Sequence, residues 1–469
     1  RPGGVVGGIG DGGHRADRQR VRSIGLRRRP PGRLLACLLP MLLAGCATYG
    51  RIDNQPLTSA AARQPGYGMS EAASAGRRDD ITLVLAFSGG GSRAAALAYG
   101  VLLELRDTRI GANGDRRLLD EVDAISAVSG GSFTAAYYGL HGDDTFRDFE
   151  SGFLRRDLTS DVLHRILSPR RWFTPEGRSD AASTLYDGTI FKGATFADLQ
   201  RRNGPLIVIN ASDLEGGIRF AFLQEFFDLL CSDLRSYPLA DAVAASSAVP
   251  VLFEPVVLQN NSGCAAPHLP QPAEDSPQLQ QVVKGLRGYA DKQQRHYVHL
   301  ADGGLTDNLG LRAFQETIDL AGGLRPFLRK IGREPNGHVV VVSVDASGKA
   351  AEGLGLERRA PSMLRAVDIM SDVQLHRYNA ATLEQMQDSL QRWAKDVSTP
   401  ERKVQPRLVT VALRDVVDES ERERLSRIST NFDLEGGQVD ALVAAGRALL
   451  RANPEFRGLL DALGGKPAN

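Results

Sequence analysis

The sequence lacks an excess of charge of one sign and a long apolar run, and each shortage excludes a class of protein. Its 57 Lys and Arg residues balance 56 Asp and Glu residues, which argues against a general nucleic-acid binder with a basic face. The apolar run at residues 34–43 has about half of the ~20 residues that a transmembrane helix needs, which argues against a polytopic membrane protein. With 42% hydrophobic residues among 469, the chain instead has the composition of a globular protein with one large or two ordinary domains.

Residues 1–45 have the composition of a targeting segment. Residues 1–33 are rich in Gly and Arg without an apolar period, and we expect them to be disordered. A cluster of arginines then precedes the short apolar run, an arrangement typical of a secretory signal peptide. The run ends in Leu-Ala-Gly-Cys, which resembles the lipoprotein box of bacteria. The resemblance implies cleavage before Cys46 and lipidation of its thiol; the alternative is an ordinary signal peptide with a chance cysteine.

A lipid on Cys46 anchors a protein to a membrane without a transmembrane helix. Ala47 follows the cysteine where inner-membrane lipoproteins have Asp, so the resemblance favours an outer-membrane lipoprotein that faces the periplasm. Residues 46–78 are rich in Ser, Ala, Gln, Pro and Gly, and we expect a lipidated cysteine followed by a flexible tether. The folded part is therefore predicted to begin near Asp79.

Strand and helix patterns alternate between residues 79 and 346. Near-continuous apolar runs at 81–87, 122–128, 206–209 and 339–344 predict strands covered on both faces, and helical periods follow the first two. This alternation predicts an α/β fold with a mostly parallel central sheet, flanking helices and active loops at the carboxyl ends of strands. Residues 347–469 are predicted to be mainly helical and to pack on this core.

The first candidate loop is residues 88–93, Ser-Gly-Gly-Gly-Ser-Arg, between a predicted strand and a helix. Its glycines let the backbone approach a ligand, and the free N–H groups of the helix start suit an anion. Gly89, Gly91 and Ala94 also satisfy a dinucleotide-binding pattern, which remains an alternative. That pattern requires an acidic residue at the end of the next strand, and the next strand ends in a serine.

That serine is Ser129, in Ala-Val-Ser-Gly-Gly at residues 127–131. Small neighbours permit a tight strand-turn-helix elbow, which exposes the hydroxyl and directs backbone N–H groups at a bound acyl oxygen. The alternative is a helix N-cap. Ser132 can serve as that cap, which leaves Ser129 free to act as a nucleophile.

A nucleophilic serine needs a base. His338 or His376 would complete a triad in the order Ser, acid, His, but the first begins a predicted strand and the second lies inside a helical stretch. Asp302 ends a predicted strand and precedes two glycines that let another loop come close. A carboxylate in a dry site can accept the hydroxyl proton. An ordinary Asp-Gly turn is the alternative.

The segments at residues 88–93, 127–131 and 302–304, in this order, resemble the patatin-like phospholipases. The resemblance extends to residues 210–214 and 245–250, and it covers about residues 80–345. It implies a patatin-like fold and a Ser-Asp dyad that hydrolyses acyl esters of lipids without a cofactor or metal. Three small residues depart from the family pattern: Ser88 stands where many members have Asp, and Ala94 and Ala127 stand where many have Gly.

Carried over to this chain, the resemblance implies a nucleophile, a base and an oxyanion hole. Ser129 is then the nucleophile and Asp302 the base. The backbone of the Gly-rich loop and of the residue after the nucleophile forms the oxyanion hole, which comprises Gly89, Gly90, Gly91 and Gly130. Arg93 holds the loop in place.

We therefore expect a membrane-anchored lipid acyl hydrolase acting on phospholipids or other acyl esters, with no nucleic-acid partner. A catalytically weak lipoprotein that serves in binding or envelope assembly is one alternative, and an esterase that uses a later histidine is another. In an oxidising periplasm Cys231 and Cys264 are expected to form a disulfide, although two separate core cysteines would fit the sequence too.

Overall fold

The structure is a computed structural model that describes residues 50–59, 64–69, 80–166, 177–250, 252–264, 267, 269, 276–348, 354–356 and 358–466. All of them lie in the second of the two units into which the chain divides, Thr48–Asn469. The expected signal peptide and Cys46 lie outside the described residues.

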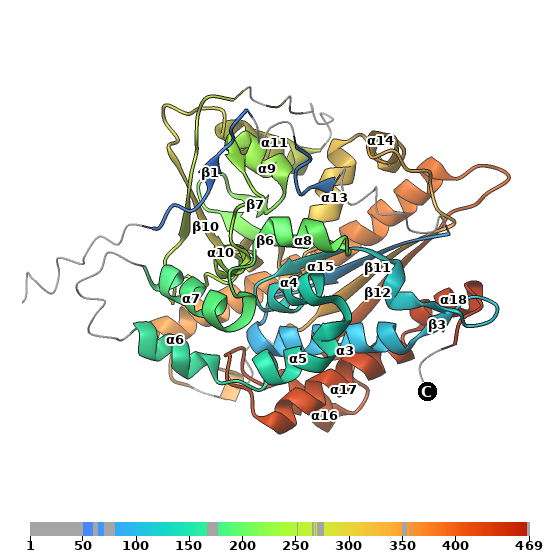
Figure 1. Ribbon diagram of the computed structural model, residues 1–469. Helices are drawn as coiled ribbons and strands as arrows, with labels where there is room; N and C mark the ends of the chain where they lie inside the picture. The colour runs from blue at the N-terminus through green and yellow to red at the C-terminus, as the bar shows by residue number, and fades with distance from the viewer. Residues whose placement is uncertain are drawn as a thin grey trace, which may run out of the picture. The chain divides into compact units, whose positions relative to one another are not determined.

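A mixed eight-stranded sheet forms the centre of the fold (Figure 1). Its order is β12-β11-β2-β5-β6-β10-β9, and β7 pairs with β6. The strands from β12 to β6 run parallel, whereas β10, β9 and β7 run antiparallel to their neighbours. The bounds are β2 Ile81–Phe87, β5 Val122–Val128, β6 Leu206–Asp213, β7 Ile218–Ala221, β9 Val256–Gln259, β10 Tyr297–Asp302, β11 His338–Asp345 and β12 Gln405–Ala412.

Burial on both faces explains the apolar runs. Every residue of β5 and β6 is buried, as is all of β11 after its first residue. The predicted α/β class with a mostly parallel sheet and flanking helices is thus confirmed. The strands predicted at 81–87 and 122–128 match β2 and β5 in full.

Helices cover both faces of the sheet. Alternate residues of β11 point into different cores, with Val340 and Val342 in the larger one and Val339 and Val341 in a smaller one under α15. The main helices are α3 Gly91–Asp107, α4 Gly130–His141, α5 Thr145–Phe149, α6 Leu158–Ile166, α7 Arg178–Tyr186, α8 Phe196–Arg202, α9 Gln224–Leu229, α10 Leu239–Ser246, α11 Pro277–Gly288, α12 Gly304–Asp307, α13 Arg312–Leu320, α14 Leu324–Lys330, α15 Met363–Val397, α16 Glu419–Ser426, α17 Gly436–Ala452 and α18 Pro454–Ala462.

The C-terminal part contributes to the core of the fold. It supplies β12, a strand that the sequence analysis did not anticipate, and α17, which lies along α3 (Figure 1). These two helices touch backbone to backbone, because a Cβ on Gly446 would lie 2.4 Å from the Leu97 carbonyl oxygen and one on Gly100 would lie 2.3 Å from that of Val443.

The prediction of a flexible tether at residues 46–78 is wrong for the part that the structure describes. Strand β1 (Gln55–Pro56) pairs with β8 (Ser232–Asp233), and the Asn54 side chain binds both backbone groups of Gln259. Arg51 forms an ion pair with Asp241 at 2.8 Å. These contacts at residues 51–56 are hydrogen bonds and ion pairs, which leave no periodic signal. Further along the segment, the Tyr67 ring is buried in the hydrophobic core against Phe196. Nearby, a disulfide joins Cys231 and Cys264.

Replacing Glu104 by Ala should lower the free energy of unfolding by roughly 3 kcal/mol, because two arginines of α17 would lose a fully buried carboxylate. Glu104 accepts hydrogen bonds from Arg447 and Arg451. Urea unfolding followed by circular dichroism measures the change. The control is Glu419→Ala, which removes the partner of Arg422 from a solvent-exposed pair and should change stability by less than about 1 kcal/mol. Equal effects of the two substitutions would contradict this reading of the α3–α17 contact.

Candidate active site

Ser129 occupies a strained turn between β5 and α4. Its φ is 48° and its ψ is -122°, a conformation that residues with a Cβ rarely adopt. The next two residues must be glycine here. A Cβ on Gly130 would lie 2.0 Å from the Gly91 carbonyl oxygen, and one on Gly131 would lie 2.7 Å from that of Ser88. This is the strand-turn-helix elbow that the sequence predicts.

Hydrogen bonds on both sides hold the Ser129 backbone. Its carbonyl oxygen accepts from the N–H of Ser132 at 2.9 Å and from the Ser132 hydroxyl at 2.5 Å. Its own N–H donates to the Ser246 hydroxyl at 2.8 Å. The Ser129 side chain makes no capping hydrogen bond to α4, so the N-cap alternative does not describe it.

Asp302 is the last residue of β10 and lies beside Ser129. The Gly304 N–H donates to the carboxylate at 2.7 Å, and the Ser129 hydroxyl lies near enough for its hydrogen bonding to lower the pKa of Asp302. Burial raises the pKa of Asp302 to about 6, and these two hydrogen bonds only partly offset the effect. A Cβ on Gly303 would lie 2.4 Å from the Asn210 carbonyl oxygen, so the turn can sit this close to β6 only with glycine.

The direction of β10 explains how the two residues reach one level. β10 runs against β6 and overlaps only its end, with Asp302 opposite Ala211. Asn210, the preceding residue of β6, lies opposite Val128 on β5, next to Ser129. The Asp302 carboxylate therefore lies beside Ser129 although its strand runs in the opposite direction to β5 and β6.

The Gly-rich loop at residues 88–93 lies against the Ser129 turn. Gly90 and Gly91 have positive φ values of 131° and 57°, and Gly91 and Gly130 begin α3 and α4. The first N–H groups of a helix have no acceptor within it, so those of Gly91 and Gly130 can hold an oxyanion. Gly89 differs from the expectation, since its N–H donates to the Asn308 carbonyl oxygen at 3.0 Å. Gly89 shapes the loop and is not an oxyanion donor.

Arg93 fixes this loop to the C-terminal part of the chain. Its Nη1 donates to the carbonyl oxygens of Ser426 at 3.3 Å and Ile428 at 2.8 Å. Burial lowers the pKa of Arg93. The same connection brings the Thr430 backbone against Gly91, so residues between α16 and α17 form one wall of the site.

Neither later histidine takes part in the arrangement. His338 is the first residue of β11, opposite Ile81. It therefore lies at the amino-terminal ends of the parallel strands, whereas Ser129 lies at their carboxyl-terminal ends. His376 lies within α15, and its Nε2 has no hydrogen-bond partner in the part of the chain that the structure describes.

Two buried residues of the site were not identified from the sequence. The carbonyl oxygen of Asn308 accepts the Gly89 N–H, and its side-chain Oδ1 lies 2.7 Å from the position that a Cβ on Gly89 would take. Ser246 binds the Ser129 N–H. Ser246 belongs to the 245–250 segment that carried the resemblance, whereas nothing in the sequence distinguishes Asn308.

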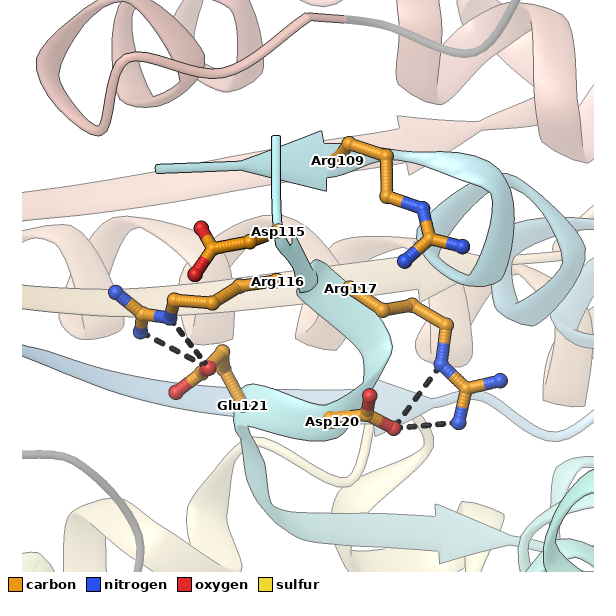
Figure 2. A pocket seen from close by; sticks show the side chains of 6 residues that line it. All are labelled: Arg109, Asp115, Arg116, Arg117, Asp120 and Glu121. Carbon is orange, nitrogen blue, oxygen red and sulfur yellow. Dashed lines mark hydrogen bonds and ion pairs between the residues drawn. The ribbon is translucent and has the colours of Figure 1, made fainter. Parts of the chain in front are cut away.

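A separate pocket lies beside the β3–β4 hairpin (Arg109–Ile110 and Arg116–Arg117), where Figure 2 shows three arginines among three acidic residues. The residues that line this pocket come directly before β5 in the chain, so the pocket lies at the amino-terminal end of β5, whereas Ser129 lies at its carboxyl-terminal end. Arg116 pairs with Asp80 and Glu121, which neutralise it. Within the described residues, no cluster of His, Cys, Asp and Glu is placed to hold a metal ion.

Comparison with known proteins gives one family match. The family model for patatin-like phospholipases matches residues 85–314, which include the Gly-rich loop, Ser129 and Asp302. No curated protein matches the chain.

Among solved structures, human GIVD cytosolic phospholipase A2 is similar at 14% identity and a TM-score of 0.40, over 84% of this chain and 64% of that one. Its complex with methyl gamma-linolenyl fluorophosphonate is similar at 14% identity and a TM-score of 0.39, over 82% of this chain and 59% of that one. VipD from Legionella pneumophila is similar at 11% identity and a TM-score of 0.28, over 92% of this chain and 73% of that one. The chain thus spans less than two thirds of the two human phospholipase chains.

Replacing Asp302 by Asn should stabilise the protein at pH 8. Because burial raises the pKa of this carboxyl from 3.8 to about 6, wild-type protein loses stability as pH rises through 6, whereas the amide of the variant carries no charge to bury. We expect a gain of roughly 1–3 kcal/mol at pH 8 that disappears below about pH 4, measured by thermal unfolding at both values. Asp461→Asn, on the surface of α18, should show no such pH-dependent gain. Equal midpoints of Asp302→Asn and wild type at pH 8 would contradict the assignment of a buried carboxyl with a raised pKa.

Proposed function

We propose that the protein is a serine lipid acyl hydrolase that uses a Ser129–Asp302 dyad, because the family model for patatin-like phospholipases matches residues 85–314. The observation that carries the proposal is the placement of Ser129 beside the buried Asp302 carboxylate and the Gly-rich loop. A strained serine, a buried carboxylate and helix-start N–H groups together meet the needs of acyl transfer.

The reaction proceeds in two steps. The Ser129 oxygen attacks the ester carbonyl of the lipid while Asp302 accepts the hydroxyl proton, and the N–H groups of Gly90, Gly91 and Gly130 stabilise the oxyanion. Asp302 then protonates the departing alcohol, which leaves an acyl-Ser129 ester. A water molecule, deprotonated by the same carboxylate, attacks this ester, and Asp302 returns the proton to the Ser129 oxygen as the fatty acid leaves.

The raised pKa of Asp302 suits this role. A base works best when its pKa is close to the operating pH, because it is then both ionised and able to take a proton. At a pKa of about 6 the carboxylate is mostly ionised at neutral pH and is a stronger base than an exposed aspartate.

We further propose that the enzyme is an outer-membrane lipoprotein anchored through Cys46 and facing the periplasm. The lipoprotein box at residues 43–46 supports the anchor. Among the helices that the structure describes, none combines the length and the apolar character needed to cross a membrane. The substrate class is a phospholipid or another acyl ester of the envelope to which the anchor holds the enzyme.

Replacing Ser129 by Ala should reduce hydrolysis of p-nitrophenyl fatty esters and phospholipid vesicles about 10⁴-fold, because the nucleophile is removed while the fold is retained. In wild type, kcat/KM should rise with pH through about 6, as Asp302 loses its proton, and remain level above it. The controls His338→Ala and His376→Ala should keep near-normal rates. Wild-type rates in Ser129→Ala protein would overturn the dyad, and lost activity in a histidine variant would favour a triad.

Cys46→Ser should abolish lipid anchoring. In a bacterial host fed an alkyne fatty acid, the wild-type chain preceded by its signal segment should become labelled and sediment with outer membranes. The variant should be unlabelled and appear in the periplasmic fraction. Labelling that persists in Cys46→Ser would contradict the proposed anchor, while leaving the catalytic proposal unchanged.

A further inference from the structure

One buried serine outside the dyad contacts the machinery on both of its sides. Ser246 is the last residue of α10, and its side chain is fully buried. Its hydroxyl accepts the Ser129 N–H at 2.8 Å and donates to the Asn210 carbonyl oxygen at 2.6 Å. Its own carbonyl oxygen accepts the N–H of Gly303, the residue after the proposed base, at 3.1 Å.

The arrangement closes a ring of hydrogen bonds under the site. The Asn210 side chain donates to the Ser126 hydroxyl at 2.9 Å and to the Ala127 carbonyl oxygen at 3.1 Å, both on the strand that leads to Ser129. The Asn210 carbonyl oxygen lies against Gly303. Because Ser246 must donate to Asn210, its lone pairs are left to face the Ser129 N–H.

From this geometry we propose that Ser246 is a positioning residue that sets the distance between the Ser129 hydroxyl and the Asp302 carboxylate. The inference rests on the proposed function, because it concerns the same reaction. Ser246 touches neither substrate nor the reacting atoms. It acts by fixing the strained backbone of Ser129 and the turn after Asp302 to one helix end.

The consequence of losing the hydroxyl follows from the same contacts. Ser246→Ala leaves a buried N–H and a buried carbonyl oxygen without their partner, so the Ser129 turn can shift. A misplacement of about 1 Å can cost as much as ~100-fold in rate. Because the Ser129 hydrogen bond lowers the pKa of Asp302, weakening that bond raises it.

The test compares four variants with wild type by hydrolysis of a p-nitrophenyl fatty ester from pH 5 to 9. For Ser246→Ala we expect kcat to fall about 10- to 100-fold with KM nearly unchanged, and the acid limb of the pH profile to move up by about 0.5–1 unit. Ser343→Ala is the matched control. It removes another buried serine hydroxyl, one that has no hydrogen-bond partner among the described residues, and should leave rate and profile unchanged.

Ser246→Thr and Ser246→Val cover the case in which Ser246→Ala fails to fold. Thr and Val have nearly the same size and differ by the hydroxyl group. A higher kcat in the Thr variant than in the Val variant, together with an acid limb at lower pH, therefore measures the effect of the hydroxyl. A wild-type pH profile and kcat in Ser246→Ala, or identical Thr and Val variants, would overturn the positioning role while wild-type hydrolysis upholds the dyad. A wild-type protein that neither hydrolyses esters nor reacts with a fluorophosphonate would overturn both proposals.

Discussion

The backbone of Ser129 is the constraint on which the site depends. A non-glycine residue at a φ of 48° costs about 1–3 kcal/mol, and it persists only where its surroundings determine it. Here Gly130 and Gly131 make room for the turn, and Ser132 and Ser246 hold it from either side. The central sheet supplies the rigid frame that these contacts require, because β5 is buried throughout and paired on both edges.

The proposed dyad also depends on a mixture of strand directions. The parallel strands β2 and β5 place the Gly-rich loop and Ser129 at their carboxyl-terminal ends. The antiparallel β10 pairs only with the last residues of β6, and this offset places Asp302 beside Ser129. The contact between α3 and α17 and the Arg93 bonds extend the frame to the C-terminal part, whose backbone at Thr430 closes one side of the loop. The site is thus built from segments more than 300 residues apart in the sequence.

Local pattern was enough to predict that Ser129 and Asp302 stand at the ends of strands, and to predict most of the sheet. Ser129 and Asp302 each stand between a strand and glycines, and such a signal is contained in a few adjacent residues. The direction of β10, the role of Asn308 and the docking of residues 50–57 depend on long-range hydrogen bonds between polar groups, which carry no periodicity. The sequence predicted that the Gly89 N–H belongs to the oxyanion hole together with its neighbours. Only the fold reveals that this N–H already donates to the Asn308 carbonyl oxygen.

The central claim is that burial beside Asp302 makes Ser129 a nucleophile. Its most direct measurement is reaction of the folded domain, from residue 47 onward, with a fluorophosphonate probe, followed by mass-spectrometric mapping of the adduct. The account predicts a single adduct on Ser129 that forms at neutral pH and is lost in Asp302→Ala protein. An adduct on another serine, or one on Ser129 that forms equally fast without Asp302, would contradict it.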